Sequence, residues 1–127
     1  MVRSAFREDF RAFMEDHVPE QRRTFDWHDA ARDPEANYPV DWRVNGTLRP
    51  LLVYALANDD QVNVATISMH QFERWGLVSR SLGVFEAQEE INRKVLARFT
   101  DVCERQFSSL AGNRDRIAAF LDEAVKA

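Results

Sequence analysis

YPVDWRVNG (residues 38–46) and LLVYALA (residues 51–57) are the two stretches that decide the fold. In the first, apolar and polar residues alternate strictly, which is typical of a strand with one buried face. The apolar positions that would share that face are Tyr38, Val40, Trp42 and Val44. The second stretch is continuously apolar, which favours a strand buried on both faces. Asn45-Gly46 is a strong turn signal, so we expect two neighbouring strands of one sheet.

An amphipathic helix is expected before these strands. Its apolar stripe at the helical period comprises Phe6, Phe10, Phe13, Met14 and His17. Ser4 is a suitable N-cap, and Pro19 ends the helix because a proline disfavours helical geometry in the residue before it. The stripe has no other apolar cover in its own segment, so the helix should pack on the sheet.

The remaining pattern predicts an α/β (α+β) single domain over residues 1–127. The extended segments are Phe25–Trp27, the two stretches above and Leu82–Phe85, while Val62–Trp75 is ambiguous at its start, has helical spacing afterwards and stops at Gly76. A helix is expected from Gln88 towards Leu110 with a break near Thr100, then a last helix capped by Asn113. The expected order is α, β, β, β, α, β, α, α. This is an αβββαβ core with a mixed sheet of about four strands, flanked by helices, two of them C-terminal.

Composition restricts the class of protein. The chain has 127 residues, 45% of them apolar, and no apolar run approaches the ~20 residues that span a bilayer. The first ten residues lack the apolar core of a signal peptide, so we expect a cytoplasmic protein with no membrane association. The one cysteine, Cys103, cannot form an internal disulfide, and its helical apolar pattern favours a small buried side chain over a reactive thiol.

Charge argues against nucleic acid as a partner. Fifteen Arg and two Lys are spread among 21 acidic residues, with a net charge of −4 and no basic stripe. Binding to random duplex DNA should therefore be weaker than roughly 10 μM near physiological salt. No phosphate-binding loop, glycine-rich dinucleotide turn or zinc-ligand spacing is present, so we expect no cofactor and no metal.

The order αβββαβ, with Pro39-Val40-Asp41-Trp42 on its second strand, resembles the core of the PD-(D/E)XK nuclease superfamily. The resemblance implies a metal-binding Asp at the position of Asp41, with an acid-x-Lys triplet on the next strand and Glu8 as an accessory acid. That next strand instead has Val53-Tyr54-Ala55-Leu56, without acid or lysine. A lone carboxylate binds Mg²⁺ poorly. We therefore expect a degenerate, noncatalytic core in which Asp41 faces solvent and pairs with Arg43 or Arg49.

The chain also resembles a small family of bacterial domains of unknown function, often encoded on prophages and plasmids. The resemblance extends from the opening helix through YPVDWRVNG and LLVYALAND to the final helices. It implies a mobile-element setting and assigns no activity.

Other candidate residues favour structural or surface roles. No serine or cysteine nucleophile accompanies His28 in Asp26-Trp27-His28-Asp29, so His28, His70 and the Arg22-Arg23 pair are expected at the surface, and His17 at the helix end. Trp42 is expected in the core. Arg74 and Trp75 are our predicted partner-binding residues, because tryptophan and arginine dominate interface hot spots.

Three functional hypotheses follow. The leading one is a noncatalytic protein-binding module of a phage or mobile element that docks on a host or element-encoded protein, such as a defence-system inhibitor or an antitoxin-like partner. The second is a residual metal-dependent nuclease-like enzyme that uses Asp41 and Glu8. The third is a nucleic-acid-binding remnant of a nuclease fold. The sequence identifies neither the partner nor the oligomeric state.

Overall fold

The computed structural model describes residues 5–46 and 48–126, which form a five-stranded mixed sheet with helices on both faces. The elements are α1 (Phe6–His17), η1 (Glu20–Arg22), β1 (Arg23–Trp27), β2 (Val40–Val44), β3 (Leu51–Leu56), α2 (Asp59–Arg74), β4 (Arg80–Phe85), η2 (Gln88–Glu90), α3 (Arg93–Thr100), β5 (Arg105–Phe107) and α4 (Arg114–Lys126). The strand order is β1-β2-β3-β4-β5. The first three strands pair antiparallel, and β3, β4 and β5 are parallel. This confirms the expected α+β class and αβββαβ core.

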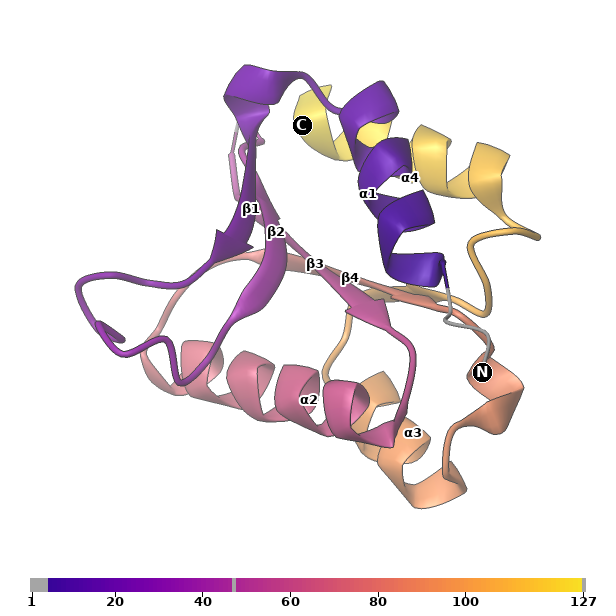
Figure 1. The fold of residues 1–127 in the computed structure, drawn as a ribbon. Coiled ribbons are helices and arrows are strands. Elements are labelled where there is room, and N and C mark those ends of the chain that lie inside the picture. The colour runs from indigo at the N-terminus through magenta and orange to yellow at the C-terminus, as the bar shows by residue number, and fades with distance from the viewer. Residues whose placement is uncertain (1–4, 47, 127) are drawn as a thin grey trace.

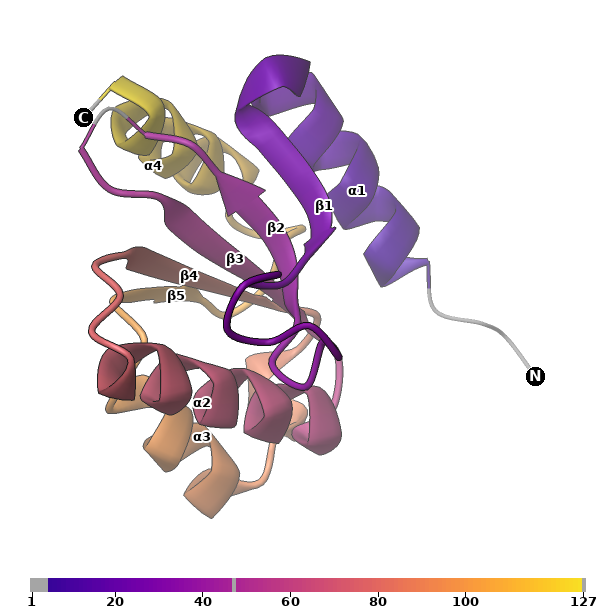
Figure 2. The ribbon, with the colours of Figure 1, turned by 90° about the vertical axis from the view of Figure 1, so that its left-hand side faces the viewer.

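Helices α1 and α4 cover one face of the sheet, and α2 and α3 cover the other (Figures 1 and 2). On the first face, Phe10 is fully buried, and its ring centroid lies 5.1 Å from that of Trp42. Phe6, Phe13 and Met14 are buried beside it, which confirms that the opening helix packs on the sheet. His17 is exposed, and its ring packs on Phe13 at 4.3 Å.

Strand β3 lies in the middle of the sheet, and all six of its residues are buried. Leu51, Val53 and Ala55 pack towards α1 and α4, whereas Leu52, Tyr54 and Leu56 pack towards α2 and α3. The continuous apolar run is therefore explained by cover on both faces.

The ambiguous segment after β3 is helical from its start. Asn58 is the N-cap of α2, and its side chain accepts a hydrogen bond from the Gln61 amide. The helix ends at Arg74, and Gly76 follows with a φ of 75°, in the left-handed region that glycine adopts without strain. The sequence also predicted two N-caps. Ser4, predicted for α1, lies outside the described residues, and Ala5 is at the N-cap position of that helix. Asn113 directly precedes α4, but its side chain donates to the Ser109 carbonyl.

The helix expected from Gln88 towards Leu110 ends at the predicted break near Thr100, but it begins only at Arg93 and does not resume after the break. Helix α3 ends at Thr100, and residues Arg105–Phe107 form a fifth, edge strand parallel to β4. Phe107 packs on the α1 and α4 face, while the stripe of α3 packs on the opposite face. The apolar side chains of α3 and Phe107 have the sequence spacing of one helical stripe, although they lie on opposite faces of the sheet. Cys103 consequently lies in the turn between α3 and β5, not in a helix.

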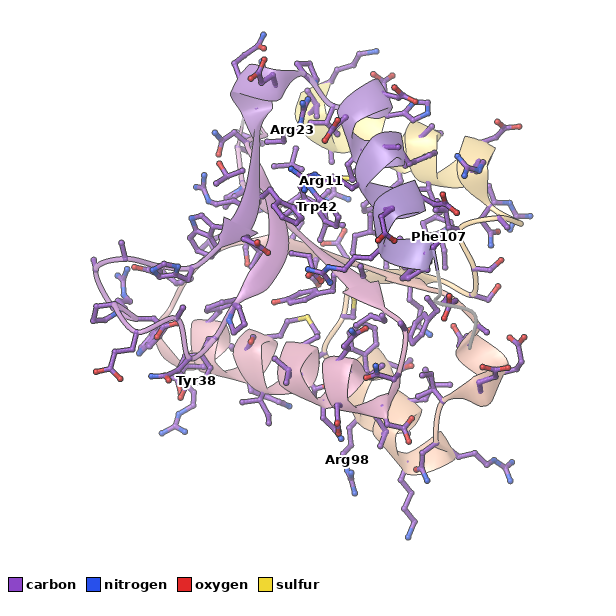
Figure 3. The ribbon with its side chains drawn as sticks, in the orientation of Figure 1. Arg11, Arg23, Tyr38, Trp42, Arg98 and Phe107 are labelled. Atoms are coloured by element: carbon purple, nitrogen blue, oxygen red, sulfur yellow. The ribbon has the colours of Figure 1, made fainter. Side chains whose placement is uncertain are left out.

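A second prediction was wrong at the start of β2. Tyr38 precedes the strand, and Val40 and Trp42 pack on opposite faces of the sheet. The paired strand β1 behaves in the same way, with Phe25 on the α1 face and Trp27 on the α2 face. Asp26, between them, has a φ of 52°, which breaks regular strand geometry at this point. In Figure 3, Trp42 lies beside α1 and Tyr38 lies on the side of α2.

Candidate functional site

The candidate site is a cleft that forms where β2 separates from β3. The two strands are in register from Val44↔Leu51 to Trp42↔Val53, and the pairing stops there. Beyond this point lies a cleft of about 360 Å³. It is lined by Arg7 of α1, Asp26, Pro39, Val40 and Asp41 of the β1–β2 segment, Tyr54 and Ala55 of β3, and Asp60, Gln61, Val64 and Ala65 of α2.

Side chains replace β2 as hydrogen-bond partners of the backbone in the cleft, at Ala55 of β3 and at Ala57 just after it. Asp41 Oδ2 accepts a hydrogen bond of 2.7 Å from the Ala55 amide. Gln61 Oε1 accepts a bond of the same length from the Ala57 amide. Buried backbone amides need partners, so these two side chains let the strands part without leaving amides unpaired.

Asp41 is the most enclosed carboxylate of the cleft, and only 18% of its side chain is exposed. Its Oδ1 accepts a hydrogen bond of 2.8 Å from Arg7 Nη2. Burial raises the pKa of Asp41 above its ordinary value, although the Ala55 amide and Arg7 both oppose this rise. The prediction of a solvent-facing Asp41 paired with Arg43 or Arg49 is therefore wrong.

The partner of Asp41 comes from the opening helix instead. Arg7 Nη2 also lies 3.8 Å from Asp26 Oδ1, so one guanidinium forms ion pairs with two carboxylates. Arg43, by contrast, bonds to the Asn45 side chain and stacks over Trp27 at 5.5 Å, and Arg49 is exposed in the β2–β3 turn. Because Arg7 and Asp41 are 34 residues apart, no local pattern indicated the pair.

The nuclease-like ligand set is not assembled in the described part of the chain. Glu8, the proposed accessory acid, is exposed on α1 and does not line the cleft, where its neighbour Arg7 lies. Tyr54 and Ala55 occupy the β3 wall in place of an acid. Among residues 5–46 and 48–126, no group of three or more His, Cys, Asp or Glu side chains is placed to hold a metal ion.

Tyr54 is an unusual wall residue. Its hydroxyl is buried, and within the described residues it has no hydrogen-bond partner. Burial raises its pKa well above the ordinary value, and the Cys103 thiol and the Asp41 carboxylate add to the rise. A buried hydroxyl without a partner is energetically costly.

Sequence reasoning missed Arg7, Asp26, Asp60 and Gln61 as cleft residues. Only Gln61 had a local signal. It follows Asn58 by three residues, the spacing of a capping box, in which the side chain of the later residue reaches back over the helix start. Here Gln61 accepts from the amide of Ala57, the residue that precedes the N-cap Asn58.

The predicted partner-binding residues lie on a different part of the surface, at the C-terminal end of α2. Arg74 is exposed. Trp75 is half-buried, and its ring lies perpendicular to that of Tyr38 at 5.6 Å and 6.0 Å from that of Phe72. Trp75 thus contributes to a contact within its own chain, and its role in partner binding stays a prediction.

The remaining candidate residues have structural or surface positions. Trp42 is buried in the core, His70 is exposed and His28 is half-buried. The guanidinium of Arg23 bonds to the Val18 carbonyl, and that of Arg22 bonds to the carbonyls of Asn45 and Val125.

Cys103 has the properties of an unreactive thiol. Burial raises its pKa to about 11, and its Sγ donates to the Arg105 carbonyl at 3.2 Å. Thiols react as thiolates, so this side chain is a poor nucleophile near neutral pH.

Comparison with known proteins yields no relative of this chain. No protein-family model matches it, and neither a curated protein nor a solved structure is significantly similar to it. Within the described residues, no helix is long and apolar enough to cross a membrane.

Proposed function

We propose that this chain is a noncatalytic protein-binding module of a phage or mobile element, which docks on a host or element-encoded protein. A defence-system inhibitor and an antitoxin-like partner are examples of such a role. The mobile-element setting rests on the resemblance of YPVDWRVNG and LLVYALAND to domains encoded on prophages and plasmids.

One observation carries the binding role. Val64 and Ile67 lie three residues apart on α2, so they share one helix face, and they are 44% and 57% exposed. Val64 also lines the cleft, whose walls include Pro39, Val40 and Ala65. The exposed apolar surface of α2 therefore continues into a concave site. Exposed apolar surface that is contiguous, and not scattered as single residues, is typical of an interaction site.

The chemistry of the cleft favours binding over catalysis. Its most enclosed carboxylate, Asp41, is already bonded to Arg7 and to the Ala55 amide. Magnesium needs several converging oxygen ligands, and the β3 wall offers none from a side-chain carboxylate. These features support a cleft that binds a partner and carries out no metal-dependent reaction.

The binding role is tested by affinity capture from the native host with a matched pair of variants. Ile67→Glu places a charge on the exposed face of α2. Leu48→Glu makes the same kind of change at a site that is 86% exposed in the turn between β2 and β3. A stoichiometric partner should be retained by the wild type and by Leu48→Glu and lost from Ile67→Glu. Equal capture by both variants would remove α2 from the interface.

A residual nuclease-like enzyme remains the alternative because Asp26, Asp41 and Asp60 line the same cleft. We expect no cleavage of plasmid, single-stranded DNA or RNA in the presence of Mg²⁺ or Mn²⁺. The assay compares the wild type with Asp41→Ala, and the same preparations are tested for binding to duplex DNA. Cleavage that disappears in Asp41→Ala would replace our proposal with the enzymatic one.

A further inference from the structure

We propose that the cleft between β2, β3 and α2 binds a basic side chain, lysine or arginine, that the partner protein presents. This inference rests on the proposed binding function and names the group that the partner inserts. It is carried by the shape of the cleft, its charge and the unpaired polar group in its wall.

The walls suit the shape of a long basic side chain. Pro39, Val40, Val64 and Ala65 provide apolar surface. Lysine and arginine bury their methylene stems against such surface and keep the charged head in a polar environment. The polar groups at which the head would arrive are the carboxylates of the same cleft, Asp26, Asp41 and Asp60.

The charge of the cleft is only partly balanced by the chain itself. Three carboxylates and one guanidinium line it, so its formal charge is −2. Arg7 is shared between Asp41 and Asp26, and the Asp26 side chain is 68% exposed. Asp60 is exposed and forms no ion pair within the described residues. An anionic ligand would be repelled, whereas a cation would complete the balance.

The wall contains a second, independent indication of a ligand. The Tyr54 hydroxyl is buried and has no partner among the described residues. Its pKa is raised by burial first, then by the Cys103 thiol, and the Asp41 carboxylate adds to the rise. An ammonium or guanidinium group bound at Asp41 would bring N–H donors to this part of the wall, where the hydroxyl can accept one.

The negative charge of Asp41 is not needed for the backbone geometry. Its Oδ2 accepts from the Ala55 amide, which a neutral amide side chain would also do. A carboxylate is kept here although burial disfavours its charged form. Charges kept at a cost in stability are typical of functional sites.

A protein is the source that fits this cleft. Val64 belongs both to the cleft wall and to the exposed apolar face of α2 that includes Ile67. A basic side chain inserted in the cleft would therefore be attached to a surface that covers this face. A divalent ion is disfavoured, because Asp26 and Asp41 already share Arg7 and no group of three ligating side chains converges within the described residues.

The inference is tested by NMR titration of the ¹⁵N-labelled full chain with three capped peptides. Acetyl-Gly-Arg-Gly-amide and acetyl-Gly-Lys-Gly-amide carry the proposed group, and acetyl-Gly-citrulline-Gly-amide has nearly the shape of the arginine peptide without its charge. The basic peptides should shift the amide signals of Ala55 and Val64 with a Kd on the order of 1 mM, as one side chain allows. The citrulline peptide should leave these signals in place.

The matched variants remove the same charge from two places. Asp26→Asn combined with Asp60→Asn makes the cleft formally neutral, and asparagine tolerates the left-handed backbone at residue 26. It should weaken binding of the basic peptides by about threefold to tenfold. Asp115→Asn combined with Asp122→Asn, both exposed on α4, changes the net charge equally and should leave the affinity unchanged.

Three outcomes would overturn the inference: shifts of equal size with citrulline, equal weakening by the α4 control, and no shift of either amide up to about 20 mM peptide. Larger shifts of the same amides with MgCl₂ than with the peptides would overturn it in favour of a metal site. None of these results affects the capture experiment with Ile67→Glu. The failure of this inference can therefore be distinguished from failure of the proposed function.

Discussion

Strand β3 has two neighbours, and its two sides differ in how the backbone is satisfied. On one side, β4 pairs with it in parallel along its whole length, from Leu51↔Arg80 to Leu56↔Phe85. On the other side, β2 pairs only as far as Trp42↔Val53, and the side chains of Asp41 and Gln61 then take over as acceptors. On the paired side, backbone groups of β4 are the hydrogen-bond partners of β3, while the split side has side-chain partners and a charged cleft. Where the strands separate, side chains therefore take the place of a neighbouring strand as hydrogen-bond partners.

The largest effect is expected from removing an apolar side chain that covers β2, the strand on the split side of β3. Phe10 of α1 is fully buried against Trp42, and Phe10→Ala should cost about 3–5 kcal/mol of unfolding free energy through the cavity it leaves. Urea unfolding measures this loss. Glu15→Ala on the exposed face of the same helix is the control and should stay within about 0.5 kcal/mol.

Deleting residues 1–18 extends this test to the whole helix. Cooperative unfolding should disappear, because α1 is part of the core. A truncated chain with a sharp melt near the parent temperature would instead make α1 a detachable arm.

A smaller effect is expected from removing one of the substitute acceptors. Gln61→Ala deprives the Ala57 amide of its partner and should cost about 1 kcal/mol, since a lost hydrogen bond to a partly buried group has this magnitude. Hydrogen exchange at Ala57 should accelerate while exchange in β4 is unchanged. Gln61→Glu keeps an acceptor oxygen and should preserve the slow exchange. Equal acceleration in β4 would show that the two sides of β3 open together.

The smallest effect, and one of opposite sign, is expected at Asp41. Burial raises the pKa of this carboxyl in the folded chain, so its contribution to stability is present below the ordinary Asp pKa and is lost as the pH rises through the raised value. Asp41→Asn keeps an acceptor for Ala55 and removes this pH dependence. At pH 7 the melting temperature of the variant should exceed that of the wild type by at most a few degrees. This difference should vanish below about pH 3.9. A lower melting temperature at pH 7 would mean that the ion pair with Arg7 outweighs the burial.

The sequence predicted the regular parts of this molecule well and its irregular parts poorly. The stripe of Phe6, Phe10, Phe13 and Met14 correctly predicted a helix with one buried face. The apolar run from Leu51 correctly predicted a strand that is buried on both faces. The three-residue strand β5 was missed because Phe107 continues the spacing of the preceding helix. A strand this short has no period of its own.

The candidate site was only half predictable. Asp41 stood out as a polar residue in an apolar strand, but its partner was expected on neighbouring strands and lies on α1. The alternating pattern of a strand does not indicate where the β2–β3 pairing ends, or that Val40 and Trp42 lie on opposite faces of the sheet. The kink at Asp26 in β1, where the backbone is left-handed, is likewise indicated by no sequence period.

That kink also has a consequence for the behaviour of the chain at high concentration. β1 is an outer strand of the sheet, and an outer strand with regular geometry is a template on which other chains can add and aggregate. Asp26 interrupts β1 at its fourth residue with a left-handed backbone and a charged side chain. An incoming chain could pair with only a few residues before meeting this interruption. The same residue that lines the cleft therefore also protects the β1 edge of the sheet from edge-to-edge growth.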